Sequence, residues 1–165
     1  MAFDCFIKLD GVDGESEDAK HAKWVEVLSF SHGVSQTASA SVSSGGGRSA
    51  GRTDHADFSI TKTLDATSPK LNQMCSSGEH IPNVEVQLHR SDGTKPEYMN
   101  YKFNDVIITS VHVSGSPQGG DPLPMETVSF AYGKINWKYT PTDHKTGKAG
   151  TAVPTFWDLH KNEKG

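Results

Sequence analysis

The sequence predicts a mostly β protein in which a curved, barrel-like sheet carries one short flanking α-helix. Most apolar residues alternate with polar ones, which is the period of a strand with one buried face. Helix start and stop signals occur together in one segment only, near residue 70. The alternation also changes parity at Gly133-Lys134, where a glycine within a strand usually marks a bulge and hence a bend.

The first strand is predicted at residues 3–9, whose odd positions are Phe3, Cys5, Ile7 and Leu9. A turn rich in Gly, Asp and Glu follows at residues 10–20. Residues 24–34 begin with apolar side chains on both parities, which predicts a strand buried on both sides before the segment turns polar.

Four further strands are predicted. Phe58, Ile60 and Leu64 mark one of them, and Val84, Val86 and Leu88 mark the next, both with polar residues opposite. From residue 99 to 113 the odd positions are mostly apolar, which indicates one long bent strand or two short ones joined near Asn104-Asp105. The last runs from 128 to 139, through the change of parity described above.

The single helix is predicted from Ser68, which can cap it, to Gly78, which can stop it. Pro69 suits the first helical position. Such a short helix needs tertiary packing, so its apolar face is expected to lie on the sheet. That face consists of Leu71, Met74 and Cys75.

Two segments carry almost no apolar residues: a long polar loop at 35–51 and a polar C-terminal segment at 141–155. Neither is a domain linker, because the stretch before residue 35 is too short to bury a core alone, so residues 1–165 form a single domain. A loop at 35–51 can be a flexible surface loop. Loops of this length are uncommon, however, unless they are functional or become ordered against a partner.

The composition indicates a thin core. Leu, Ile, Val and Phe make up 32 of 165 residues, while the net charge is only -4. A folded domain with so small a hydrophobic core is often completed by packing against neighbouring subunits. The acidic balance and the scattered Lys and Arg residues argue against a nucleic-acid partner.

The N-terminus and the two cysteines bear on the cellular compartment. No basic n-region opens the chain, and no apolar run reaches the roughly 20 residues that span a bilayer. We therefore expect a protein that is cytoplasmic before assembly, does not insert into membranes, and is secreted, if at all, without a signal peptide. Cys5 and Cys75 lack the spacing of a disulfide framework and are expected to be reduced, buried thiols.

Motif matches give no catalytic or cofactor site. Residues 47–51 match G-x-S-x-G, with Ser49 as the nucleophile, but that elbow needs a strand before it and a helix after it. Here a Ser/Gly-rich stretch precedes the match and a predicted strand follows. Gly45, Gly47 and Ala50 fit G-x-G-x-x-A, again without the helix that would receive a pyrophosphate.

Metal binding is not indicated either, although the chain has eight histidines. None lies within five residues of another, whereas zinc sites usually include a closely spaced pair of ligands. We therefore expect no catalytic residues, no cofactor and no metal, and the protein is predicted not to be an enzyme.

The strongest signal is a block of sequence rather than a catalytic motif. It reads FSITKTLD at residues 58–65, TSPKL at 67–71 and CSSGEH at 75–80. Further matches are the opening strand, GES at 14–16, VLSFSHGVSQ at 27–36 and the Gly-rich loop that follows. Together they resemble the Hcp family, the tube subunit of the bacterial type VI secretion system, over nearly the whole chain except the tail after residue 141.

The resemblance implies a small β-barrel of two packed sheets. It further implies a homohexameric ring, rings stacked into a tube, a spike protein at the tube tip, a contractile sheath around it, and small effector proteins in its lumen. Ser31 matches the family position that faces the lumen. A ring-stacking loop would comprise Ser43, Ser44, Gly45, Gly46, Gly47, Arg48, Ser49, Ala50 and Gly51.

Three alternatives remain at this point. A phage-type tail-tube protein would share the fold and the ring. A monomeric β-sandwich could bind a ligand such as a carbohydrate through exposed Trp137 or Trp157. A hydrolase would use Ser49.

Overall fold

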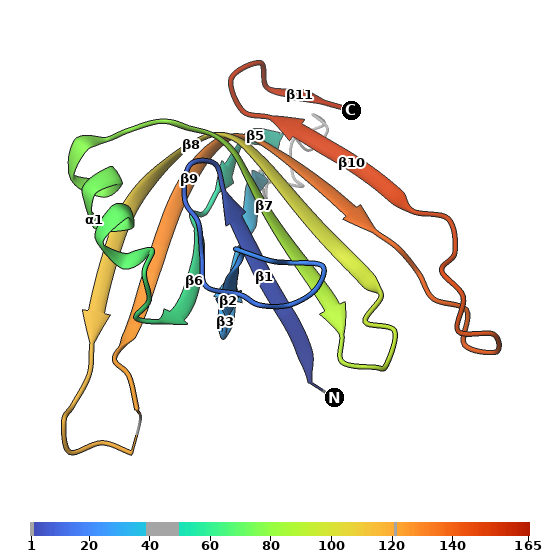
Figure 1. Ribbon diagram of the computed structural model, residues 1–165. Coiled ribbons are helices and arrows are strands. Elements are labelled where there is room, and N and C mark those ends of the chain that lie inside the picture. Colours follow the sequence, from blue (N-terminus) through green and yellow to red (C-terminus); the bar gives the residue numbers. More distant parts are fainter. Residues whose placement is uncertain (1, 39–49, 121) are drawn as a thin grey trace.

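The computed structural model describes residues 2–38, 50–120 and 122–165. Within this part of the chain the predicted class is confirmed: the protein is mostly β, with two sheets and one short helix (Figure 1). In chain order the elements are β1 Phe3–Leu9, β2 Val25–Val27, β3 Ser29–Ser31, β4 Val34–Ala38, β5 Ala50–His55, β6 Phe58–Thr63, α1 Ser68–Ser77, β7 Ile81–Arg90, β8 Glu97–Ser114, β9 Met125–Tyr139, β10 Val153–Asp158 and β11 Glu163–Lys164.

The larger, nine-stranded sheet has the order β11-β10-β9-β8-β7-β1-β2, and β6 and β3 branch from β9. This sheet curls, because the consecutive strands β2 and β3 pair with two different strands. Strand β2 pairs with β1, whereas β3 pairs with β6. Residues 25–31 therefore bridge the two edges, and no uninterrupted ladder closes the barrel.

The prediction of a single strand at residues 24–34 is wrong, because β2, β3 and the start of β4 lie in this segment. The break between β2 and β3 falls at Leu28, where the chain passes from one neighbouring strand to the other. The backbone N–H of Leu28 donates to the carbonyl of Thr61 at 2.8 Å. The side chain of Leu28 is 58 % exposed and points away from the core, although the apolar run around it predicted burial.

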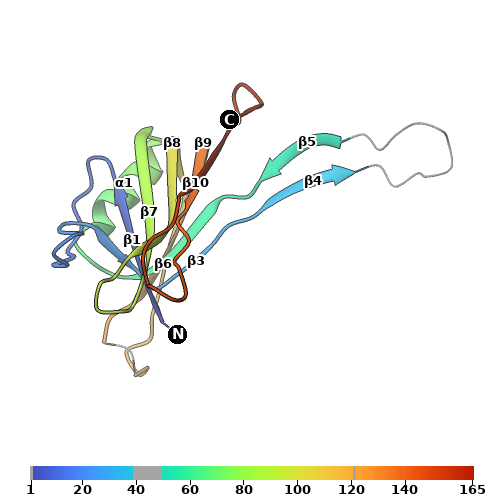
Figure 2. The ribbon, with the colours of Figure 1, turned by 90° about the vertical axis from the view of Figure 1, so that its right-hand side faces the viewer.

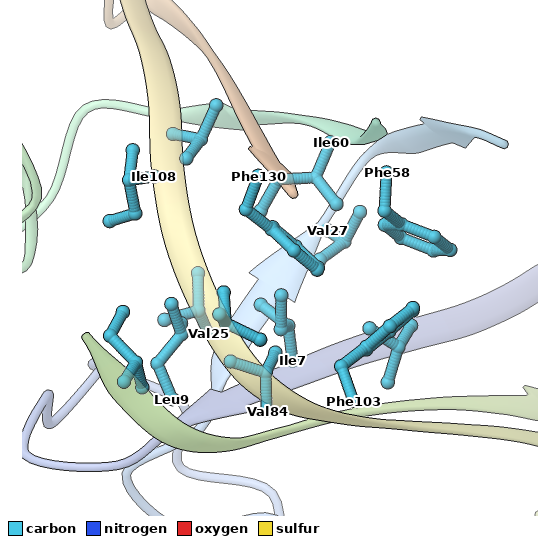
Figure 3. Packing of buried hydrophobic residues seen from close by; sticks show 14 of the residues in the cluster. Ile7, Leu9, Val25, Val27, Phe58, Ile60, Val84, Phe103, Ile108 and Phe130 are labelled. Atoms are coloured by element: carbon cyan, nitrogen blue, oxygen red, sulfur yellow. The ribbon is translucent and has the colours of Figure 1, made fainter. Parts of the chain in front are cut away.

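The core lies inside the curl and is centred on aromatic rings from three strands (Figure 3). Phe58, Phe103 and Phe130 have no exposed surface. The ring centroid of Phe103 lies 5.0 Å from that of Phe58 and 5.0 Å from that of Phe130, both in edge-to-face geometry. Such pairs add to the stabilisation that burial of the rings already provides.

The two longest strands, β8 and β9, change parity together. Buried positions shift by one residue at Asp105 in β8 and at Gly133 in β9, which lie across from each other in the ladder. Asp105 has φ 52°, a left-handed conformation that Asp tolerates better than most residues. The bends predicted near Asn104-Asp105 and at Gly133-Lys134 are therefore confirmed, and they occur at one place in the sheet.

The helix ends as predicted but begins one residue earlier. Gly78 is left-handed with φ 67°, and its N–H donates to the carbonyl of Met74 at 3.0 Å. The N-cap is Thr67 rather than Ser68. Ser68 does not cap the helix because its Oγ accepts from the backbone N–H of Asp65 at 3.1 Å and from Nζ of Lys62 at 3.2 Å.

The polar segment predicted at 141–155 leads into structure that the sequence did not reveal. Its end belongs to β10, which pairs with β9 over six positions, and β11 pairs with β10. The half-buried side chains of Trp157 and Leu159 pack against the core. Cys5 is buried and Cys75 half-buried, and both are free thiols.

Candidate functional site

Four adjacent strands, β3, β6, β9 and β8, present hydroxyl groups on their outer face. Ser31 is paired with Ser59, Ser59 with Ser129, and Ser129 with Ser110, so four serines form one row across the strands. The next outward row contains Ser29, Thr61 and Thr127, and His112 of β8 occupies its fourth position. We define the hydroxyl face by these residues: Ser29, Ser31, Ser59, Thr61, Ser110, Thr127 and Ser129.

The hydroxyl face follows from the alternation within each strand. Phe30, Ile60 and Val128 form the row between the two hydroxyl rows, and their side chains point inward to the core. The hydroxyls of Ser59 and Ser129 lie 2.7 Å apart and share a hydrogen bond. The face therefore offers short, uncharged groups that donate and accept hydrogen bonds but provide no ion pairs.

The structure places Ser31 on β3, at one end of the serine row; Ser31 and Ser110 at the other end are both exposed. Within the described part of the chain, no histidine is hydrogen-bonded to a hydroxyl of this face. A serine nucleophile needs a neighbouring base. The arrangement therefore suits surface contact rather than acyl transfer.

Strands β4 and β5 form a separate two-stranded sheet that projects from the body of the molecule (Figure 2). We call residues 34–38 and 50–55 the arm. Ala38 is paired with Ala50 at its outermost described position, and Nε2 of Gln36 donates to the carbonyl of Gly51 at 2.7 Å. The loop predicted at 35–51 thus begins and ends in strands. Of the predicted ring-stacking residues, Ala50 and Gly51 lie in β5, while residues 43–49, including Ser49, lie outside the described residues.

Two histidines and a tyrosine meet where the arm joins the body. Nε2 of His32 lies 2.6 Å from the hydroxyl of Tyr132, and Nδ1 of His55 lies 2.8 Å from the same oxygen. Burial raises the pKa of Tyr132, with a smaller contribution from the charge of Asp57. Burial also lowers the pKa of His32, and the nearby His55 lowers it further. Burial lowers the pKa of His55 against an opposing effect of Asp54.

With both imidazoles neutral, this cluster is satisfied. One ring N–H donates to the phenol oxygen, and the phenol O–H donates to the other ring nitrogen. Protonating both rings would leave the phenol O–H without that acceptor and place two positive charges side by side. The junction of the arm is therefore built for the neutral form.

A second histidine cluster was not predicted. The carboxylate of Asp105 lies 2.6 Å from Nδ1 of His80 and 2.9 Å from Nε2 of His160, and these contacts lower the pKa of Asp105. The three residues are 25 and 55 positions apart in the chain, so only the fold brings them together. They tie the end of the helix and the C-terminal hairpin to the bend in β8.

Other candidate sites receive little support. Among the described residues, no group of three His, Cys, Asp or Glu side chains could hold a metal ion. In the same part of the chain, no helix is long and apolar enough to cross a membrane. Trp137 and Trp157 are half-buried and pack against the core, so part of each ring is committed to the fold.

These features define a class: a mostly β protein with a polar sheet face, a projecting arm and, among the described residues, no assembled metal or serine-nucleophile centre. A family model described as "Type VI secretion system effector, Hcp" matches residues 6–139. The chain belongs to the Hcp family of type VI secretion tube proteins.

Individual proteins agree with this assignment. The chain is 36% identical over 163 residues to Protein hcp1 of Pseudomonas aeruginosa, covering 98% of each protein. It is 32% identical over 99 residues to the Major exported protein of the same organism, covering 56% of this chain and 58% of that protein. A solved structure described as that of a type six secretion system protein has a TM-score of 0.93 at 38% identity, covering 99% of this chain and 100% of that one.

Proposed function

We propose that the protein is a structural subunit that forms hexameric rings, that the rings stack into the inner tube of a type VI secretion system, and that effectors are exported through the lumen. Family membership over most of the chain is the observation that carries the proposal. The subunit makes and breaks no covalent bond in this role. It is made in the cytoplasm and leaves the cell as part of the tube.

The hydroxyl face supports the assignment of Ser31 to the lumen. A passage for proteins should contact them without holding them, and short neutral hydroxyls form only modest hydrogen bonds that water can replace. A charged wall would instead retain cargo of opposite charge. The hydroxyl face is therefore the part of the described surface that is best suited to line a bore.

The arm supports the assignment of ring stacking to the region around residues 43–51. The side chains of β4 are exposed along its whole length, and those of β5 are exposed or half-buried, although both strands are hydrogen-bonded to each other. A two-stranded ribbon is marginal when isolated. A partner surface, here the adjacent ring, would bury it. The spike protein, the contractile sheath and the effectors are further proposed partners, by analogy with the family.

Negative-stain imaging with light scattering tests the proposal directly. Uniform six-fold doughnuts with the mass of a hexamer are expected for the purified chain. A monomer at all concentrations would overturn the proposal and would favour a binding module.

The position of Ser31 can be tested by labelling within the ring. In a Cys75→Ser background, Ser31→Cys should react with a small maleimide but become resistant as polyethylene glycol of increasing mass is attached to the reagent. Gln73→Cys, at an exposed position of the helix, is the matched control and should react with every reagent. Equal reactivity of both cysteines with the largest reagent would place Ser31 outside the bore.

A further inference from the structure

Two segments that lie far apart in the strand order of the larger sheet carry opposite charge. Residues 10–26, which connect β1 to β2 and include the first two residues of β2, contain six carboxylates and two lysines. Residues 134–165, from the second half of β9 onward, contain six lysines and three carboxylates. In the strand order, β9, β8, β7 and β1 lie between β2 and the edge formed by β10 and β11. In Figure 2 the segment before β2 lies at the left of the body and the C-terminus at the right.

Exposed side chains of both segments are available to a partner. Glu15, Glu17 and Glu26 are exposed, and no ion pair among the described residues involves them. We call these three residues the acidic edge. Four exposed lysines of the other segment are likewise free of ion pairs within the described ranges. We call them the basic edge: Lys145, Lys148, Lys161 and Lys164.

The backbone holds the acidic edge in place. The N–H of Gly14 donates to the carbonyl of Lys23 at 2.7 Å, and the N–H of Ser16 donates to that of Trp24 at 3.0 Å. A Cβ on Gly14 would lie 2.3 Å from the carbonyl oxygen of Trp24, so only glycine allows this approach. Glu15 and Glu17 are thus presented by a folded segment, and little conformational entropy is lost when they bind.

The basic edge is held in the same way. Asp143 N–H donates to the carbonyl of Lys148 at 2.9 Å, and Gly150 N–H donates to that of Pro141 at 2.7 Å. Beside this edge, a hollow of about 590 Å³ opens between β7, β8, β9 and β10. Lys102, Lys138 and Phe156 are among its lining residues, and the side-chain carboxylate of Glu85 accepts hydrogen bonds from Asn100 and Gln87. Lys138 is already paired with Glu97 at 3.6 Å, whereas no ion pair among the described residues involves Lys102. Lys102 is therefore the lining lysine that can receive a carboxylate of a docking segment.

We propose that the acidic edge of one copy docks against the basic edge of the next copy in the ring, with the neighbour's residues 10–26 covering the hollow beside β10. This inference rests on the proposed function, because it names the contact through which rings form. A two-fold contact through either edge would place like charges opposite each other, whereas joining one edge to the other is a heterologous contact, the kind from which rings are built. The charges thus disfavour two-fold dimers relative to rings, and they raise the rate at which subunits associate.

Charge reversal of each edge tests the docking. The variant Glu15→Lys/Glu17→Lys/Glu26→Lys carries two positive edges, and the variant Lys145→Glu/Lys148→Glu/Lys161→Glu/Lys164→Glu carries two negative ones. Each alone is expected to run as a monomer by light scattering at roughly physiological ionic strength. An equimolar mixture is expected to regain the full mass, with native mass spectrometry detecting only rings that contain equal numbers of both variants.

The matched control reverses charges away from both edges, with Lys70→Glu and Glu79→Lys on and just after α1, and should form wild-type rings. Circular dichroism checks that every variant is folded. If either edge variant forms rings alone, or if the folded variants fail to recover mass on mixing, the edge pairing is wrong while the proposed function stands. A wild type that never forms rings would instead overturn both.

Discussion

Nζ of Lys62 lies 3.4 Å from Oε2 of Glu126, and both side chains are completely buried beneath the start of the helix. The lysine also contacts the carboxylate of Asp65 at 2.9 Å, so one cation serves two acids from different parts of the chain. Within the described residues, the other oxygen of Glu126 has no hydrogen-bond partner. Burial of a charge costs free energy. Removing one partner of a buried ion pair is therefore strongly destabilising, because the other charge is left without a counter-ion.

We expect Lys62→Met to destabilise the fold by about 3–5 kcal/mol, because it leaves Glu126 buried without its counter-ion. Glu126→Gln should have a smaller effect, since Lys62 keeps Asp65. Urea unfolding, at a concentration where all variants have the same oligomeric state, measures the difference. The reverse ranking would show that the buried pair is not the main role of Lys62.

Acidification should loosen the junction of the arm. The pKa values of His32 and His55 are lowered in the fold, so the unfolded chain binds these protons first. Their contribution to stability is therefore present above the ordinary histidine pKa of about 6.5 and is lost as the pH falls from there toward the folded-state pKa values. Hydrogen exchange of residues 34–38 and 50–55 should accelerate over this range.

The matched variants for this prediction are His32→Gln/His55→Gln and His144→Gln. The first should show a smaller loss of melting temperature between neutral and acidic pH than the wild type. The second, on the exposed turn of residues 141–150, should behave as the wild type. Identical pH profiles for all three proteins would exclude the junction as the titrating element.

Gly14→Ala should be clearly destabilising, by about 1–3 kcal/mol, because the added Cβ collides with backbone that cannot rotate away. At Gly93 nothing lies within 4 Å of an added Cβ, so Gly93→Ala is the control and should stay within about 0.5 kcal/mol. Thermal unfolding measures both. A neutral Gly14→Ala would mean that residues 10–24 can move away from β2 without penalty.

Replacing residues 43–49 by two glycines should leave single rings intact but reduce their stacking. Strands β4 and β5 remain in this variant, so the folded body is unchanged. Light scattering should give the wild-type ring mass, and electron microscopy should show fewer and shorter stacks. Loss of the ring itself would assign this segment to contacts within the ring.

Cys5 should resist alkylation in the folded protein. Burial raises the pKa of its thiol to about 12, which leaves almost no reactive thiolate at neutral pH. Mass spectrometry after iodoacetamide treatment should detect modification of Cys5 only in urea. Modification at equal rates with and without urea would show that β1 opens readily.

The sequence predicted the parts of the fold that depend on local pattern. The alternation of apolar and polar residues predicted β6 and β7, and the change in the parity of the apolar positions at Gly133 predicted the bend in β9. The serines and threonines of the hydroxyl face also alternate, but their alignment into rows depends on how distant strands register. Pairing of Ser31 with Ser59, and of Ser59 with Ser129, is set by long-range ladders.

Other features could not be predicted because the decisive contacts are tertiary. Strand β10 is held mainly by its ladder with β9 and by Trp157, so its own sequence gives a weak signal. The break at Leu28 results from a change of neighbour, which an apolar run conceals. The contacts of Asp105 with His80 and His160 join three chain segments, and no spacing rule connects them.

The bridging segment at residues 25–31 has a kinetic consequence. Strands β1 and β6 both expose an unpaired edge until that segment is in place, and open edges invite mispairing between chains. Its partners in β6 lie about 30 residues away, and β6 in turn pairs with β9 nearly 70 residues later, so the topology favours slow folding. Docking of residues 25–31 would then separate two populations of chains. Chains with this segment in place have paired edges on β1 and β6, and chains without it expose those edges and aggregate.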